Sequence, residues 1–334
     1  MIKMISRTFL SLSVFAVATL ATLHADTSSA ETLKFAHFVS PVHVVNSSIA
    51  EPLKEGLESD TDGSLELRIY PGGELGSGPT EQYVRVLQGV ADIVWGIPGY
   101  TSSQFPKSLV VEMPGAIPEG MTGYEMLWNA YDEHLKSEFP GTKPLALWTS
   151  EPSIFIMKDE IIRTPEDLEG LKIRVSGEMT ADLITAYGGT PVQMSAGEIY
   201  NALQTGLIDG VVTGTSAVGD FKLDEVANAY SIGAPLGHIM FYLVMNQNSY
   251  DTLSEEHQAA IDANSGLELS RSGEEAWNRR AEEILQEMKA APENTVVELD
   301  EAEIEAFETI ADDFRQRALE DRGAANVLNA MQGK

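Results

Sequence analysis

Short apolar segments alternate with helical patterns along the first hundred residues. Residues 33–38, 65–70 and 91–95 are typical of strands, because their apolar side chains alternate or form short runs bounded by turns. Residues 44–58 and 80–88 lie between these segments and carry apolar positions at helical spacing. The resulting β-α-β-α-β order predicts a parallel sheet flanked by helices, and therefore an α/β fold.

The same alternation continues through the second half of the chain. The pattern over 254–290 is long for a single globular helix, so we expect it either to lie across two domains or to break once. Further strands are expected at 145–150, 153–158, 171–175, 229–232 and 240–246, and further helices at 121–139, 179–187 and 301–319.

Two pairs of segments resemble each other across the two halves. Residues 65–69 and 171–175 are both alternating strands that carry an Arg at the fourth position. Residues 87–92 and 203–209 follow them in the same order, each with Leu-Gln, a Gly and an Asp. This order suggests two similar α/β lobes. Two lobes that face each other create a cleft, which suits a protein that closes on a small ligand.

Arg174 is the most informative single residue. It lies at the carboxyl end of the strand 171–175, directly before a helix that is expected to start near Met179. Ligands of open α/β sheets bind at strand ends, and a free helix amino terminus favours an anion. The guanidinium can hold a carboxylate through two parallel hydrogen bonds. The alternative is that Arg174 lies on a solvated face or pairs with Glu178.

Composition narrows the class of protein. The chain has 334 residues, no cysteine and a formal net charge of −29, so disulfides and thiolate chemistry are excluded and nucleic acid is not an expected partner. Residues 1–30 resemble a signal peptide, with cleavage after Ala25 or Ala30, although an uncleaved membrane anchor is the alternative. We therefore expect an exported soluble protein.

The motifs resemble the solute-binding subunits of tripartite ATP-independent periplasmic (TRAP) transporters, of the dicarboxylate-binding type. This resemblance implies a two-lobed periplasmic binding protein fold of the Venus-flytrap kind, with a long helix that spans both lobes. It implies lobe I at 31–152 plus 240–278, and lobe II at 153–239 plus 279–334. The motifs that carry it are 167–175, 188–192, 198–206 and 208–210 in the second half, and 33–37, 70–76 and 89–93 in the first.

The resemblance also implies that Arg174 grips the ligand carboxylate. Members that bind sugar acids carry polar or charged side chains where this chain has Ile97 and Ile154, including a second Arg near the latter. A second buried carboxylate would lack a partner here, so we expect a monocarboxylate with an apolar or mildly polar body. The contact positions of the family fall on Phe38, Gly78, Ile97, Ile154 and Thr213.

Other side chains are candidates for the walls of the cleft. Thr215, like Thr213, follows the Asp209-Gly210 turn and could hydrogen-bond a ligand. Each aromatic candidate is also a plausible core residue. The aromatic candidates are Trp95, Trp148, Phe155 and Tyr100.

Three classes of function are considered for this sequence. An exported α/β enzyme would need a catalytic constellation, yet the chain has no Gly-x-Ser-x-Gly elbow, no phosphate loop and no His pair at metal-binding spacing. A ligand sensor that docks on a receptor kinase would need the same cleft. The favoured class is a periplasmic binding protein, without enzymatic activity, cofactor or metal. It is expected to be a monomer that delivers a small organic acid to the small and large permease subunits.

Overall fold

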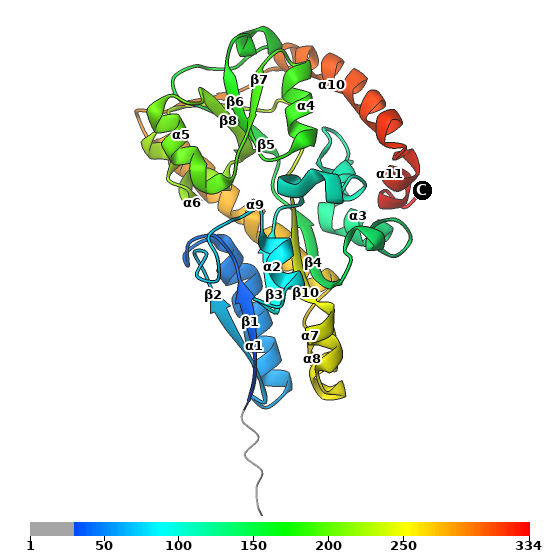
Figure 1. Cartoon of the computed structure of the whole chain (residues 1–334). Coiled ribbons are helices and arrows are strands. Elements are labelled where there is room, and N and C mark those ends of the chain that lie inside the picture. Colours follow the sequence, from blue (N-terminus) through cyan, green and yellow to red (C-terminus); the bar gives the residue numbers. More distant parts are fainter. Residues whose placement is uncertain (1–29) are drawn as a thin grey trace, which may run out of the picture.

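The computed structural model describes residues 30–334, and residues 1–29 of the predicted signal peptide lie outside this range. Two β-sheets, each with helices around it, form two lobes (Figure 1). The first sheet has the order β2-β1-β3-β10-β4. β1, β2 and β3 are parallel, whereas β10 runs antiparallel to both of its neighbours. Its strands are β1 (Glu31–Ala36), β2 (Leu65–Tyr70), β3 (Ile93–Gly96), β4 (Thr142–Thr149) and β10 (Met240–Asn246).

The second sheet has the order β11-β9-β5-β8-β6-β7. β5 is antiparallel to β8 and β9, while β6 is parallel to β7 and β8. The edge strands β7 and β11 were not predicted, because both are half exposed and lack an apolar run. The strands are β5 (Ser153–Met157), β6 (Lys172–Val175), β7 (Thr190–Gln193), β8 (Gly210–Gly214), β9 (Ala229–Ile232) and β11 (Thr295–Glu298).

Helices cover both sheets, and in the described chain none of them is long and apolar enough to cross a membrane. The α-helices that precede β10 are α1 (Glu51–Asp60), α2 (Gln82–Leu87), α3 (Gly123–Ala130), α4 (Glu178–Ala186), α5 (Ile199–Thr205) and α6 (Ser216–Asp220). Those that follow are α7 (Gln247–Thr252), α8 (Glu255–Ala263), α9 (Leu267–Ala290), α10 (Glu301–Arg322) and α11 (Ala325–Met331).

The long helical pattern at 254–290 breaks once, at Gly266. This residue has φ 79°, a conformation that glycine adopts without a Cβ clash, and its N–H donates to the Leu145 carbonyl of β4. After the break, α9 runs across the molecule and contacts β4 of the first sheet and both α6 and β11 of the second lobe (Figure 1). The pattern therefore breaks once, between α8 and α9, and it also extends across the molecule along α9.

Besides its passage along α9, the chain passes between the sheets at two adjacent short segments. Residues 150–152 connect β4 to β5, and residues 233–239 connect β9 back to β10. The segments are paired, since Ser150 N–H donates to the Ile239 carbonyl (2.8 Å) and Ser153 N–H to the Gly237 carbonyl (2.9 Å). Short paired connections of this kind suit a hinge between lobes. The residue bounds assigned to the lobes stay a prediction.

Apolar side chains fill both faces of the two sheets. Along β10, alternate residues point to opposite faces: Phe241, Leu243 and Met245 pack toward α1, α8 and α9, whereas Tyr242 and Val244 pack on the other side. That second side is shared with the second sheet and is covered by residues 105–139 and the helices α10 and α11. A third cluster packs the second sheet against α5, α6 and the end of α9.

One buried carboxylate fastens α9 to the first lobe. The two oxygens of Glu274 accept hydrogen bonds from the backbone N–H groups of Gly123 (2.8 Å), Tyr124 (2.9 Å) and Thr149 (3.0 Å). The Thr149 hydroxyl also donates to it, at 3.2 Å. Two of these donors lie at the start of α3, where backbone N–H groups lack partners within the helix. Glu274 therefore joins α3, β4 and α9.

Replacing Glu274 by Ala is expected to destabilise the protein by about 3 kcal/mol or more, because several buried backbone N–H groups lose their acceptor. The measurement is the midpoint of urea unfolding. Glu275→Ala is the matched control, since Glu275 is exposed and its ion pair with Arg279 spans 3.7 Å. Equal midpoints for the two variants would contradict the anchoring role of Glu274.

Candidate ligand-binding site

A cavity lies between the two lobes, beside the paired connections. The cavity has a volume of about 40 Å³, so its occupant must be a small molecule. Five of the nine predicted site residues line it, and they come from both lobes. These are Phe38, Trp95 and Ile97 from the first lobe, and Arg174 and Thr213 from the second.

The other four predicted site residues do not line this cavity. Gly78 lies in the loop after β2, and Trp148 is fully buried in the core between the first sheet and α9. Ile154 is adjacent to Thr213 in the ladder but packs into the third apolar cluster. Thr215 is buried between two lining residues without lining the cavity itself. Whether any of the nine binds ligand stays a prediction.

Arg174 presents an unpaired cation to the cavity. β6 ends one residue after it, and its side chain is among the largest that are fully buried, at 1% exposure. Its Nε donates to the Met194 carbonyl (3.0 Å), and its guanidinium lies beside the Tyr100 hydroxyl. It forms no ion pair with any described residue, so the proposed alternative of pairing with Glu178 does not occur. Burial lowers the pKa of this guanidinium, and the nearby Tyr100 hydroxyl and Glu198 oppose that shift.

The segment that follows β3 closes over Arg174. The Tyr100 hydroxyl lines the cavity and accepts the Ala196 N–H at 2.8 Å, which links the two lobes. A Cβ on Gly177, at the start of α4, would lie 2.8 Å from the Gly99 Cα, so only glycine permits this approach. The first N–H of α4, that of Glu178, donates to the Ser102 hydroxyl (3.2 Å). That N–H, expected to be free for an anion, therefore already has a partner.

Aromatic rings form most of the apolar wall. Phe38 stacks on Trp95 with ring centres 4.8 Å apart and planes at 21°, and Tyr100 lies beside Phe38. The Trp95 indole nitrogen is buried and has no hydrogen-bond partner among the described residues. Of the other aromatic candidates, Tyr100 lines the cavity, whereas Phe155 lies in the core. Three further aromatic residues that were not predicted from the sequence also line the cavity, namely Phe221, Phe241 and Trp277.

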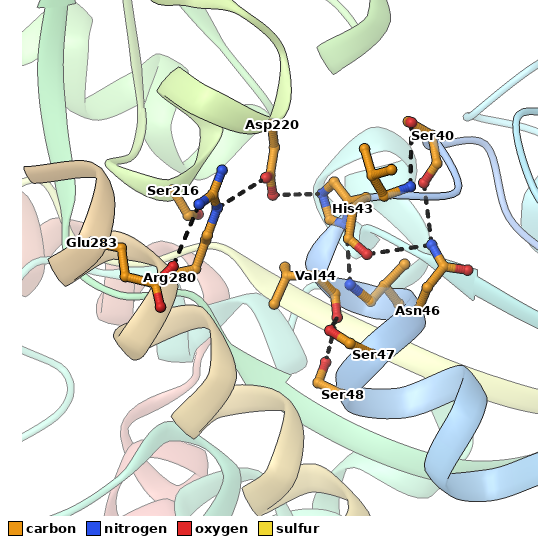
Figure 2. Close-up of polar contacts among 12 residues, drawn as sticks. Ser40, His43, Val44, Asn46, Ser47, Ser48, Ser216, Asp220, Arg280 and Glu283 are labelled. Atoms are coloured by element: carbon orange, nitrogen blue, oxygen red, sulfur yellow. Dashed lines mark hydrogen bonds and ion pairs between the residues drawn. The ribbon is translucent and has the colours of Figure 1, made fainter. Parts of the chain in front are cut away.

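A second polar group, formed by His43 and Asp220, also lines the cavity (Figure 2). His43 of the first lobe points at Asp220 at the end of α6, with Nε2 and Oδ2 3.4 Å apart. Arg280 of α9 approaches the other oxygen of Asp220, at 3.3 Å. Burial lowers the pKa of His43 to about 3, with the nearby His37 and Arg280 adding to the shift, so the imidazole is neutral near pH 7.

A buried carboxyl lies directly behind the cavity. Glu151, in the first connection between the lobes, accepts the Ser216 N–H at 2.7 Å, while its other oxygen has no partner among the described residues. Burial raises the pKa of Glu151 to about 7, and the bond from Ser216 opposes that rise. One feature of the sequence pointed to Glu151, because this acid stands beside a proline where the chain was predicted to pass between the domains.

The arrangement is that of a binding site for a small anion with an apolar body. It holds one fixed cation, aromatic walls and a polar end. Across residues 30–334 there is no group of three or more His, Asp or Glu side chains that could hold a metal ion.

The match to a known family decides the class. Residues 35–321 match the model of the bacterial extracellular solute-binding proteins, family 7. The chain belongs to this family. The members that it resembles are solute-binding proteins of transport systems, not enzymes, and the TRAP resemblance found in the motifs is confirmed.

Individual relatives agree over most of the chain. The ectoine-binding periplasmic protein TeaA of Halomonas elongata is 27% identical over 84% of this chain and 82% of its own. A TRAP solute-binding protein from Rhodoferax ferrireducens, solved with copurified benzoate, is 29% identical, with a TM-score of 0.82 over 90% of this chain and 96% of its own. A marine metagenome TRAP protein specific for aromatic acid ligands, solved with 3-hydroxybenzoate, is 27% identical, with a TM-score of 0.83 over 91% and 98%. These likenesses confirm the two-lobed α/β fold.

The family 7 protein is expected to lose stability relative to a Glu151→Gln variant as pH rises. The folded-state pKa of Glu151 is raised from 4.5 to about 7, so its contribution is fully present below pH 4.5 and is lost as pH rises through 7. The variant keeps the acceptor for Ser216 and carries no charge. The difference in unfolding free energy should grow by roughly 3 kcal/mol between pH 4.5 and pH 8.5, measured by urea unfolding.

The exposed Glu169→Gln variant controls for the loss of one charge. A Glu151→Gln difference that stays constant over this pH range would show that Glu151 is not held at a raised pKa.

Proposed function

We propose that this protein captures a small, ring-bearing monocarboxylate in the periplasm and delivers it to the small and large membrane subunits of a TRAP permease. It acts as a monomer and performs no chemistry on its ligand. The observation that carries the proposal is the Arg174 guanidinium, which is buried in an interlobe cavity without a carboxylate partner in the described chain.

The energetics of Arg174 favour an anionic ligand. A buried cation without a partner is costly to the fold, and proteins rarely retain one unless it meets an opposite charge during function. Its Nε donates to the Met194 carbonyl and its guanidinium lies beside the Tyr100 hydroxyl, so N–H groups remain that meet no carboxylate in the described chain. A ligand carboxylate would supply both the charge and the acceptors, in the paired geometry that a guanidinium favours.

The charges of the cavity favour one carboxylate over two. Within the described chain, Arg174 is the sole Lys or Arg that lines the cavity, and His43 is neutral near pH 7. Asp220 is the other acid or base of this lining that can be charged near pH 7. Its negative charge would repel a second ligand carboxylate. A dicarboxylate would therefore bring a buried anion without a cation.

The apolar wall favours a ring. Phe38 and Trp95 already stack on each other, and flat ligands add to such stacks with favourable offset or edge contacts. Two relatives support this, since their structures contain benzoate and 3-hydroxybenzoate. TeaA, named for ectoine, supports a small ligand of the same general size class rather than a particular compound.

Capture would couple to closure of the lobes. The ligand would be held between Arg174 of lobe II and the aromatic wall of lobe I, so its binding would favour the closed arrangement. The paired connections at 150–152 and 233–239 would absorb the rotation. The closed surface would then be the form that the permease subunits recognise.

A thermal-shift screen of the mature protein against small organic acids tests the ligand class. A ligand that binds only the folded state adds about 2.7 kcal/mol of stability at a hundredfold excess over its dissociation constant. Aromatic monocarboxylates are expected to raise the melting temperature, and dicarboxylates of similar size are not. A shift with dicarboxylates alone would contradict the proposal, as would a screen in which no acid produced a shift.

Replacing Arg174 by Met is expected to separate binding from stability. The variant loses the charge pair with the ligand, so its affinity for the best acid should fall by about 2–5 kcal/mol, which is roughly thirtyfold or more. The ligand-free melting temperature should stay the same or rise, because a buried unpaired charge is replaced by an apolar side chain of similar length. Calorimetric titration and thermal unfolding measure the two quantities.

Two further variants sharpen this test. Arg174→Lys keeps the charge without the planar fork and should bind with intermediate affinity. Arg279→Met removes an exposed Arg of α9 and should bind normally. If Arg174→Met bound the acid as tightly as the unmodified protein, the assigned role of Arg174 would be wrong.

A further inference from the structure

Asp220 places a carboxylate in the wall of the same cavity that holds Arg174. Its side chain is 6% exposed, and it is the one Asp or Glu that lines the cavity in the described chain. Asp220 and Arg174 form no ion pair with each other, so the two groups are available to different parts of a ligand. The cavity lining therefore combines a cation, an acid and aromatic rings.

The partners that the protein provides for Asp220 are few and distant. Burial raises the pKa of Asp220, and Arg280, whose Nε lies 3.3 Å from Oδ1, opposes that rise and favours the ionised carboxylate. Oδ2 lies 3.4 Å from His43 Nε2, longer than a normal N–H···O bond, and has no hydrogen-bond partner among the described residues. Figure 2 shows Asp220 between these two side chains.

The state of His43 is set by its own neighbours. Its Nδ1 accepts the Val45 N–H at 3.2 Å, so the proton of the neutral imidazole is on Nε2, which faces Asp220. The ring packs against Trp95, Phe221 and Trp277, which keeps it dry and uncharged. His43 thus offers Asp220 one weak neutral donor and no compensating charge.

An ionised carboxylate can accept about four hydrogen bonds, so Asp220 has unused capacity on the oxygen that the protein leaves unpaired. We propose that Asp220 is a specificity-determining residue that accepts a hydrogen bond from a hydroxyl or N–H group on the ligand, at the end away from its carboxylate. The ligand class is then a hydroxy- or amino-substituted aromatic monocarboxylate. This inference rests on the proposed function and adds the second recognition point.

The first test compares ligands that differ only in this donor. Calorimetric titrations use the hydroxybenzoates and hydroxyphenylacetates, each beside the fluoro acid with fluorine at the same ring position. Fluorine is similar in size to a hydroxyl but cannot donate a hydrogen bond. For the isomer that reaches Asp220, the hydroxy acid should bind at least about tenfold more tightly than its fluoro counterpart, since the donor meets a charged acceptor.

The second test uses Asp220→Asn, which keeps the shape of the side chain and removes its charge. The preference for the hydroxy acid over the fluoro acid should shrink to a few-fold. Binding of a benzene dicarboxylate with its second carboxylate at the same ring position should strengthen, because the repelling charge is gone. Damage to the fold would weaken the binding of every ligand. Opposite changes in the two affinities therefore distinguish a role in recognition from a structural role.

Asp182→Asn is the matched control. Asp182 lies on α4 and forms an exposed pair with Arg322 across 3.3 Å, so this variant loses the same charge outside the cavity. It should keep the preferences of the unmodified protein.

The outcomes separate the two proposals. Equal affinity of every hydroxy acid and its fluoro counterpart would overturn the role of Asp220, while binding of both would leave the Arg174 proposal standing. An unchanged preference in Asp220→Asn would also overturn it. Failure of all these acids to bind would overturn the proposed function and this inference together.

Discussion

The structure depends on a guanidinium that the fold buries and leaves without a carboxylate. Burial of an unpaired cation is costly, and here Arg174 meets the Met194 carbonyl and the Tyr100 hydroxyl but no carboxylate among the described residues. The close approach of Gly99 and Gly177 and the Tyr100 hydroxyl keep the site dry around it. A ligand carboxylate removes this cost, so the free energy that the fold gives up in the empty state becomes available for binding.

The two-sheet architecture places this cation opposite a wall of aromatic rings. β6 ends beside the cavity in the second lobe, while β3 and the segment after β1 bring Trp95 and Phe38 from the first. The paired connections and α9 join the lobes, and Glu274 fixes α9 to the first of them through backbone donors. The side chains that would hold a ligand therefore come from two bodies, which is the arrangement that allows release as well as capture.

Local patterns in the sequence were sufficient for most of the framework. β2, β9 and β10 were predicted with their observed bounds, and Arg174 was found because its strand is followed by a helix start. The expectation of a parallel sheet was incomplete, because β10 arrives from the second lobe and runs antiparallel to β3.

The rest depends on contacts between residues far apart in the chain. His43 and Asp220 meet only after two lobes have formed, and neither sits in a local pattern that indicates a partner. Trp277 reaches the cavity from the long helix, where an aromatic residue at helical spacing is indistinguishable from core. The family position Ile154 shows the converse limit, since a resemblance assigns a position without the side-chain direction that decides whether it faces the cavity.

The most direct measurement compares one aromatic acid with its primary amide on the unmodified protein, by calorimetric titration. The two ligands share a ring and nearly the same shape, but only the acid brings the charge that Arg174 lacks. Our account predicts that the amide binds at least about a hundredfold more weakly, because it leaves the guanidinium buried and unpaired. An amide that binds as tightly as the acid would contradict the account.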